Sequence, residues 1–323
     1  MGGDIKQEGG LPFEEALVAK PHVDSYRTSL AYYMLTGRKG SKVYTDGQAY
    51  VVVSKHPHIE DRLLLFPEIN GNGSLSLRIL SDMVIPKNGI QLARYSQEDL
   101  NQLQLAARYT PSNMKVDLIQ MDETIMDWEY PVHILDTSIT AALEGKSFQQ
   151  VRTKFNGVAD RLTIIPLDAE DAIRSMRAAV MFWAGAMIYA GKESGHSLTE
   201  LYDVLIKMIQ LKPEMFNGFV TMDGKEPAGF TIWDKPVDGT VNAIAGLSRR
   251  SIKGMSEFQT ITACRILEKE GIRGYNMGGS ETSELDHHKR KYLPRTSLKL
   301  SSYDVRIQNM LTAGVSELAL PTL

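Results

Sequence analysis

The pattern of apolar and polar positions changes near Pro166 in this chain of 323 residues. Before this proline, short β-rich runs alternate with short amphipathic segments. After it, the elements are longer and clearer turn signals separate them. A chain of this length corresponds to two domains of ordinary size. The sequence therefore predicts one domain over residues 1–166 and a second over residues 167–323.

The second half has a well-defined predicted order of elements, α-α-β-β-β-α-β-α-β. Asp223-Gly224 and Asp238-Gly239 separate three of its strands, and Asp-Gly is a strong hairpin signal. Helices are expected at 168–190, 197–210, 256–270 and 283–292, and strands at 216–222, 228–233, 241–247, 273–277 and 297–305. This order matches the GNAT (N-acyltransferase) fold, in which the central sheet splays open and the third helix begins at the gap.

The first half carries enough elements for a degenerate copy of the same fold. Asp46-Gly47 predicts a hairpin, and Ser96 is a candidate N-cap of the helix that follows it. Helices are expected at 26–35, 75–83, 97–107 and 146–158, and strands at 41–45, 48–54, 62–66, 90–95, 115–121 and 161–165. The predicted fold class is mixed α/β, a tandem GNAT fold with two mixed sheets flanked by helices.

Composition and charge narrow the choice of partners. With 36 basic and 39 acidic residues the formal charge is −3, so nucleic acid would have to bind through a local patch. The single cysteine, Cys264, lies in an apolar helical stretch and reads as a buried hydrophobe. The longest apolar segment, 178–190, is too short to cross a bilayer, and residues 1–10 lack the apolar core of a signal peptide. We therefore expect a soluble, cytoplasmic protein with no membrane partner.

Four segments carry a resemblance to a known family. They are RSIKGMSE at 250–257, YNMGGSET at 275–282, LDHHKRKY at 285–292 (with SYDV at 302–305 beyond it) and GKSFQQVRTK at 145–154. Together they resemble the C-terminal catalytic domain of phosphatidylglycerol lysyltransferases and its soluble relatives, over most of the chain from about residue 20 to 306. The peptidoglycan Fem ligases and some tRNA-dependent tailoring enzymes of natural-product pathways are similar to this family in fold and in the type of reaction.

The resemblance implies a transferase that moves an aminoacyl group from charged tRNA to an amine or hydroxyl of a small molecule or peptide, without a cofactor. The membrane part of the family is missing, so a lipid acceptor is not expected. One alternative is an N-acetyltransferase that uses acetyl-CoA. Its signature Arg/Gln-x-x-Gly-x-Gly/Ala is only approximate here, since Arg250 to Gly254 is one residue too long and Ser256 replaces Gly or Ala. Another alternative is a non-catalytic tRNA-binding module.

A phosphate-binding site is predicted where the helix at 256–270 begins. Gly254 would allow backbone N–H groups to approach an anion, and the helix dipole adds positive potential. Arg249, Arg250 and Lys253 come just before it. An ordinary strand–helix loop with solvated bases is the alternative interpretation.

A substrate-binding site is predicted where the strand at 273–277 ends. It comprises Tyr275, Asn276, Gly278, Gly279 and Ser280. Two consecutive glycines allow the backbone to bend sharply or to contact a substrate. Glu281 then lies near a strand end, where open α/β sheets bind ligands, and its carboxylate is a candidate to bind an amino group or accept its proton. A capping box or surface turn is the alternative.

The segment 287–299 contains five basic residues and no acid, which favours phosphate binding over a merely solvated face. The bases are Lys289, Arg290, Lys291, Arg295 and Lys299, with His287 and His288 beside them, and Lys146, Arg152, Lys154 and Arg161 are candidates to extend the patch. For catalysis, either a backbone N–H near the gap in the sheet or one of Lys289 and Arg290 is predicted to stabilise the oxyanion. Asp286 or His287 is the candidate base, and Tyr275, Tyr292 or Tyr303 the candidate group acting on the leaving oxygen. No metal site is expected, and His56 with His58 falls short of a ligand set.

Overall fold

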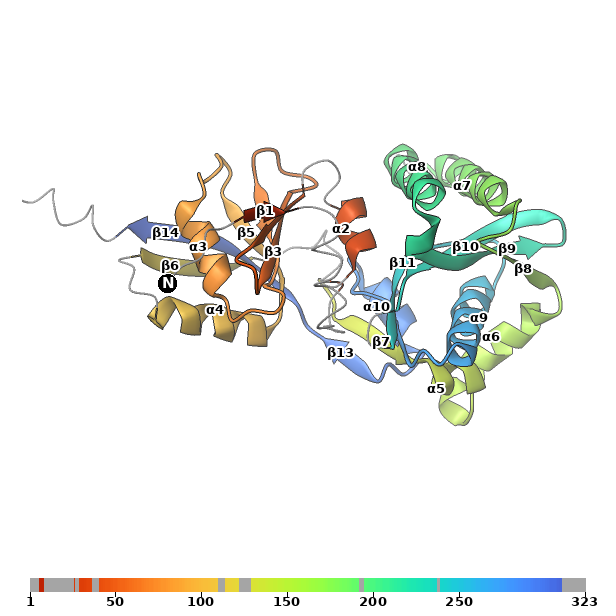
Figure 1. The fold of residues 1–323 in the computed structure, drawn as a ribbon. Coiled ribbons are helices and arrows are strands. Elements are labelled where there is room, and N and C mark those ends of the chain that lie inside the picture. The colour runs from red at the N-terminus through yellow and green to blue at the C-terminus, as the bar shows by residue number, and fades with distance from the viewer. Residues whose placement is uncertain are drawn as a thin grey trace, which may run out of the picture. The chain divides into compact units, whose positions relative to one another are not determined.

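The computed structural model describes residues 6–8, 26, 29–36, 41–109, 114–121, 129–191, 195–236 and 239–309. The chain forms two compact units (Figure 1). Unit 1 contains residues 1–30, 36–130 and 298–323, and unit 2 contains residues 31–35 and 131–297. The expected division after Pro166 thus falls inside unit 2, because the strand that ends there pairs within the sheet of unit 2.

The sheet of unit 2 has seven strands among the described residues, in the order β13-β7-β12-β11-β10-β9-β8. In chain order these are β7 (Val132–Asp136), β8 (Leu162–Pro166), β9 (Phe216–Asp223), β10 (Glu226–Asp234), β11 (Thr240–Ser248), β12 (Gly274–Asn276) and β13 (Thr296–Leu298). Neighbours from β8 to β11 are antiparallel, whereas β11 and β12 are parallel. The hairpins expected around 223–224 and 238–239 are therefore present, although Asp238 itself lies outside the described residues.

The sheet of unit 2 opens between β11 and β12. The first three residues of β11, Thr240 to Asn242, pair with β12, and the following residues up to Ser248 pair with β10. Helix α9 (Met255–Lys269) starts seven residues after Ser248, at the open end of the sheet. This splayed sheet with a helix at the gap is the GNAT arrangement that the sequence predicted.

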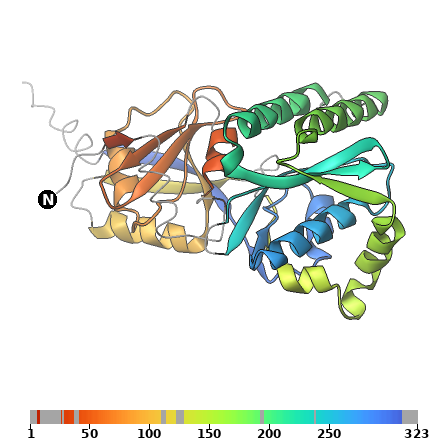
Figure 2. The same ribbon diagram turned by 45° about the vertical axis from the view of Figure 1, so that its right-hand side comes forward.

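Helices cover both faces of this sheet, and alternating side chains of the strands separate the two cores. Val220 and Ile232 pack under α7 (Ala172–Tyr189) and α8 (Gly195–Leu211), together with Ala31 of α2 (Leu30–Thr36). Their neighbours Phe219 and Trp233 point to the opposite core, with α5 (Thr137–Ala142), α6 (Gln149–Ala159) and α9. Figure 2 shows the two helix layers on either side of the strands.

Unit 1 repeats this plan, with the strand order β1-β2-β3-β4-β5-β14-β6. Its strands are β1 (Lys6–Glu8), β2 (Lys42–Thr45), β3 (Tyr50–Lys55), β4 (Leu63–Leu65), β5 (Ile90–Tyr95), β6 (Met114–Met121) and β14 (Ser301–Asn309). Again one pair, β4 with β5, is parallel. Helices α3 (Ser74–Asp82) and α4 (Gln97–Tyr109) pack on its apolar core. The Ser96 cap is confirmed, since its Oγ accepts from Asp99 N at 3.2 Å.

Strands on both sides of Pro166 are distributed between the sheets differently from the expected division, and β7 and β8 before it belong to the sheet of unit 2. In unit 1, β14 lies between β5 and β6. In unit 2, β7 lies between β12 and β13. The single last strand expected at 297–305 is therefore wrong: β13 belongs to unit 2, and β14 returns to the sheet of unit 1. Both sheets are mixed and flanked by helices, so the predicted fold class is confirmed.

Candidate functional site

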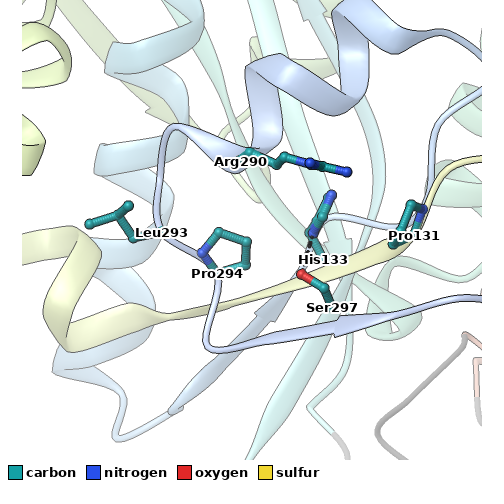
Figure 3. A pocket seen from close by; sticks show the side chains of 6 residues that line it. All are labelled: Pro131, His133, Arg290, Leu293, Pro294 and Ser297. Carbon is teal, nitrogen blue, oxygen red and sulfur yellow. Dashed lines mark hydrogen bonds between the residues drawn. The ribbon is translucent and has the colours of Figure 1, made fainter.

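Unit 2 contains an open hollow of about 520 Å³ beside helix α10 (Ser283–Arg290). Its walls come from three segments: the start of β7, the end of α10 and the chain that leads into β13. The lining residues are Pro131, His133, Arg290, Leu293, Pro294 and Ser297 (Figure 3). A second hollow of about 480 Å³ is lined by residues of α10 and shares Arg290 with the first.

Local backbone geometry brings these distant residues together. Thr282 is the N-cap of helix α10, and its Oγ1 accepts a hydrogen bond from Leu285 N at 3.3 Å. After the helix, the chain turns at Leu293, which has a positive φ of 53°. Arg295 N then donates to Ile134 O at 2.9 Å, which places the start of β13 alongside β7. Ser297 consequently faces His133, although 164 residues separate them in the chain.

A continuous hydrogen-bonded series crosses the wall of this hollow. Ser297 Oγ lies 2.9 Å from His133 Nδ1, and His133 Nε2 lies 2.7 Å from Asp286 Oδ1. The second carboxylate oxygen of Asp286 pairs with Arg290 Nε at 2.8 Å. His133 and Asp286 are 1% and 5% exposed, whereas Ser297 and Arg290 are exposed. Figure 3 shows the His133 ring between the Ser297 hydroxyl and the Arg290 side chain.

The predicted catalytic residues thus fall into two groups. Asp286 and Arg290 belong to the hydrogen-bonded series at the hollow. Lys289 instead is 7% exposed, and its Nζ donates to Gly278 O at 3.2 Å and to Gly279 O. This ammonium therefore holds α10 to the end of β12, and the expectation that it stabilises an oxyanion is corrected.

The two glycines after β12 accept hydrogen bonds from a residue at the hollow and from α10. Gly278 has a φ of 70°, which favours glycine, and its carbonyl accepts from His133 N at 3.2 Å. Asn276 is fully buried; its Oδ1 accepts from Gly278 N at 2.9 Å, and its Nδ2 donates to Asn242 Oδ1 at 2.9 Å. Asp234 in turn accepts from Asn242 at 2.7 and 2.9 Å. This polar ladder braces the sheet at the point where it opens.

The other predicted substrate-binding residues differ in accessibility. Tyr275 is buried against Trp233, and burial raises the pKa of its hydroxyl, so direct action on a substrate is corrected to a core role. Tyr292 is buried too, and burial raises the pKa of its hydroxyl, so its expected action on the leaving oxygen is likewise corrected to a core role. Ser280 is fully buried, and among the described residues its Oγ lacks a hydrogen-bond partner. Glu281 is exposed on the segment between β12 and α10.

Tyr303, the third candidate for the leaving oxygen, belongs to β14 in the sheet of unit 1. It packs there against the hydrophobic core of that unit. It is therefore not part of the site that unit 2 forms by itself.

The predicted phosphate loop is packed against the protein itself. Gly254 has a φ of 92°, and a Cβ at this position would clash with the carbonyl oxygen of Lys154 in α6. Glu257, in the first turn of α9, is 3% exposed and accepts from Lys291 Nζ at 2.7 Å and Lys154 Nζ at 3.1 Å. Burial alone would raise the pKa of Glu257, but the hydrogen bond and charge of Lys291, with the hydrogen bond of Lys154, lower it to about 2. Gly254, Lys154 and Lys291, all predicted to bind phosphate, thus form contacts among α6, α9 and α10 within the protein.

Several of the remaining predicted bases form hydrogen bonds or ion pairs within the protein. Arg249 pairs with Glu226 at 3.0 Å and lies over the ring of Phe182. Arg152 donates to the carbonyls of Leu143 and Gly145. Arg161 forms an ion pair with Asp223, and Lys299 donates to the carbonyl of Glu129 within unit 1. The predicted bases of unit 2 that are exposed are Lys146, Lys154, Arg161, Arg250, Lys253, Arg290 and Arg295; of these, Lys154, Arg161 and Arg290 form ion pairs with carboxylates.

The pKa of His288 is lowered by burial and by the neighbouring Lys291. Its Nδ1 lies 2.8 Å from Lys291 Nζ, and burial followed by the charge of Lys291 lowers its pKa to about 4. An unfolded chain takes up this proton near pH 6.5, so the folded state loses stability as the pH falls from 6.5 to 4. We expect His288→Asn, which keeps an acceptor for Lys291, to remove about 1–2 kcal/mol of this loss. Urea unfolding at several pH values measures the effect.

The control for this prediction is His287→Asn on the exposed face of the same helix. It should leave the pH dependence of unfolding unchanged. Equal pH dependence in the wild type and His288→Asn would contradict the partly buried, neutral state of His288.

No sequence motif points to His133 or Ser297. His133 lies on β7, a strand missing from the predicted elements, and Ser297 looks like an ordinary polar residue. A buried-strand pattern at Val132, Ile134 and Leu135, interrupted by one histidine, was the available signal.

Membrane spans and metal sites are both absent from the described part of the chain. In that part of the chain, no helix is long and apolar enough to cross a membrane. Among the same residues, no three His, Cys, Asp or Glu side chains are grouped so as to hold a metal ion. Cys264 is buried, as the sequence predicted.

Comparison with known proteins identifies the fold. No family model matches the sequence, and no curated protein matches it. A conserved protein of unknown function from Bacteroides thetaiotaomicron has a similar structure, with a TM-score of 0.70, 14% identity, and 94% of this chain and 100% of that chain covered. L-PGS from Bacillus licheniformis is similar with a TM-score of 0.60, 14% identity and 92% of both chains covered.

The C-terminal domain of a putative lysylphosphatidylglycerol synthetase from Agrobacterium fabrum is a third similar structure. Its TM-score is 0.59, with 10% identity and coverage of 90% of this chain and 89% of that chain. These likenesses extend over nearly the whole length of each chain, so both units share the fold. At this level of identity they concern the fold and not the chemistry.

Proposed function

We propose that this protein is an aminoacyltransferase that moves an amino acid from aminoacyl-tRNA to an amine or hydroxyl of a small-molecule or peptide acceptor. The fold shared with a putative lysylphosphatidylglycerol synthetase and the motifs at 250–257, 275–282 and 285–292 support this assignment. The observation that carries it is the buried Asp286–His133 pair, which presents a histidine nitrogen at the wall of a hollow. Natural-product tailoring is the proposed setting.

Transfer from an ester to an amine requires a proton acceptor, a polarised carbonyl and a proton for the leaving 3′-oxygen. The ester is already activated, so correct positioning in the hollow supplies much of the rate. His133 moves the protons, and Asp286 orients its ring. Arg290 stabilises the oxyanion from the mouth of the hollow. Glu281 is the proposed carboxylate for the amino group of the donor or acceptor.

The exposed bases of unit 2 are proposed to contact tRNA phosphates. Arg250 and Lys253 are both exposed and lie ahead of α9. Replacing both by Gln should weaken binding of bulk charged tRNA and reduce the slope of log K against log salt by about 1–2. Equilibrium binding across a salt series measures this slope.

The matched control replaces Lys207 and Lys225, which are exposed on α8 and in the β9–β10 turn. This charge change is the same in size, so it tests whether position or net charge matters. An equal loss in both double variants would contradict a localised phosphate site.

The acyl-CoA alternative has weaker support in the residues. The signature loop is one residue too long, and Glu257 with its two lysines occupies the first turn of α9, where a phosphate would need free N–H groups. The non-catalytic alternative, a tRNA-binding module, shares the exposed bases but does not need the Asp286–His133 pair.

One experiment separates the three functions. Bulk charged tRNA and acetyl-CoA are each titrated into the same preparation at two salt concentrations, and labelled amino acids are then screened for transfer. Salt-sensitive tRNA binding with transfer supports the proposed function. Acetyl-CoA binding without tRNA binding contradicts it, and tRNA binding without transfer from any charged tRNA to a panel of amine acceptors favours the binding module.

A further inference from the structure

Ser297 has surroundings that ordinary surface serines lack. It is exposed at the hollow, yet its hydroxyl is bonded to a histidine that is 1% exposed, which is in turn bonded to a buried carboxylate. Nucleophile, base and orienting carboxylate in one hydrogen-bonded series are the arrangement that activates a serine. We propose that Ser297 is a nucleophile and that acyl transfer proceeds through an acyl-Ser297 intermediate. This inference rests on the proposed function for its natural donor.

The hydrogen-bond partners determine the direction of the series. Arg290 Nε donates to Asp286 Oδ2, so both carboxylate oxygens act as acceptors. His133 Nε2 must then carry the proton that it shares with Asp286 Oδ1. His133 Nδ1 is left with its lone pair, and the Ser297 hydroxyl donates to it. The ring is therefore oriented to remove the Ser297 proton.

The ring nitrogens are used in the opposite sense to that in serine proteases, where serine bonds Nε2 and aspartate bonds Nδ1. Both nitrogens are equivalent for this chemistry, because each can accept a proton while the other donates. The backbone supports the geometry: His133 N donates to Gly278 O, and Met277 N donates to His133 O at 2.8 Å. Both bonds join His133 to the segment that directly follows β12, which fixes its backbone on β7 while Ser297 faces the hollow.

The proposed steps balance. Ser297 Oγ attacks the carbonyl carbon of the donor ester, and its proton passes to His133 Nδ1. The carbon–oxygen bond to the donor's 3′-oxygen breaks, and that oxygen leaves with the proton from His133. The acceptor amine then attacks the acyl-Ser297 ester and gives a proton to His133, which returns it to Ser297 Oγ as the amide is released.

Two probes test the nucleophile without tRNA. The full chain is treated with p-nitrophenyl acetate or with a fluorophosphonate, and the adduct is located by peptide mass spectrometry. We expect labelling at Ser297, its absence in Ser297→Ala, and at least tenfold slower labelling in Asp286→Asn. Ser81→Ala is the control, since Ser81 is exposed and bonded to the Asp82 carboxylate at 2.9 Å without a histidine. Absence of label at Ser297 in the folded wild type overturns the inference.

A third arm uses the proposed donor. Labelled aminoacyl-tRNA is added without acceptor, the RNA is digested, and alkali-labile label on the protein is counted. Label on the wild type but not on Ser297→Ala supports the intermediate. Undiminished transfer to an acceptor by Ser297→Ala overturns the intermediate while leaving the proposed function intact. Acylation of Ser297 by p-nitrophenyl acetate without transfer from any aminoacyl-tRNA supports the nucleophile and rejects the donor.

Discussion

Asp286→Asn should lower kcat/KM for acyl transfer by about 10²–10⁴-fold while the protein remains folded. The amide has the same shape as the carboxylate, so packing around this 5%-exposed residue is preserved. The Asn side chain can turn its NH₂ group toward His133 Nε2, which places the ring proton on Nδ1. The histidine then has no lone pair toward Ser297 and cannot take a proton there.

The measurement is kcat and KM over a pH series, with thermal unfolding to verify the fold. A positioning role predicts a loss mainly in kcat and a changed pH profile, whereas a purely structural defect lowers the amount of folded protein. Asp203→Asn makes the same chemical change on the exposed face of α8 and should behave like the wild type. A folded Asp286→Asn variant with activity within a few-fold of the wild type would exclude His133 as the base.

Gly254→Ala should destabilise unit 2 by about 2–4 kcal/mol, because two costs act together. The backbone at Gly254 has a φ of 92°, which side chains with a Cβ rarely adopt. The added methyl would also clash with the Lys154 carbonyl oxygen and push α9 away from α6. The Phe155–Phe258 stack, with ring centroids 5.9 Å apart, lies at this same helix contact.

Calorimetry should show the transition of unit 2 lowered by roughly 5–15 °C. Gly157→Ala is the matched control in α6: its Cβ would meet open space, and alanine favours a helix by about 0.5–1 kcal/mol. If Gly254→Ala left the transition unchanged, the close helix approach would be wrong. An anion-binding role for this glycine would then regain support.

Most of the fold was readable from local patterns. Strand 90–95 coincides with β5, and the hairpins at Asp46-Gly47 and Asp223-Gly224 were set by turn chemistry. The long helices α7 and α8 were visible from apolar periodicity, because each buries one face against the sheet. The order of elements was sufficient to identify the splayed GNAT sheet.

The site itself was only half readable. Asp286 and Arg290 stood out because they lie in a charged helix within a recognisable motif. Lys289 stood out equally, yet its ammonium holds the Gly278-Gly279 carbonyls. Charge in a sequence does not say which side chains face inward, since a single turn of α10 places Lys289 in the interior and Arg290 at the hollow.

The sequence by itself determined the class of fold, the turn positions, the buried state of Cys264 and the basic segment around α10. Local propensity and periodicity act over a few residues, and these features depend on nothing more. Only the tertiary structure decided that β7 joins the sheet of unit 2 and that β14, from the end of the chain, returns to the sheet of unit 1. It alone placed Ser297 against His133, because pairing between residues 164 positions apart follows from packing of the whole unit and leaves no local trace.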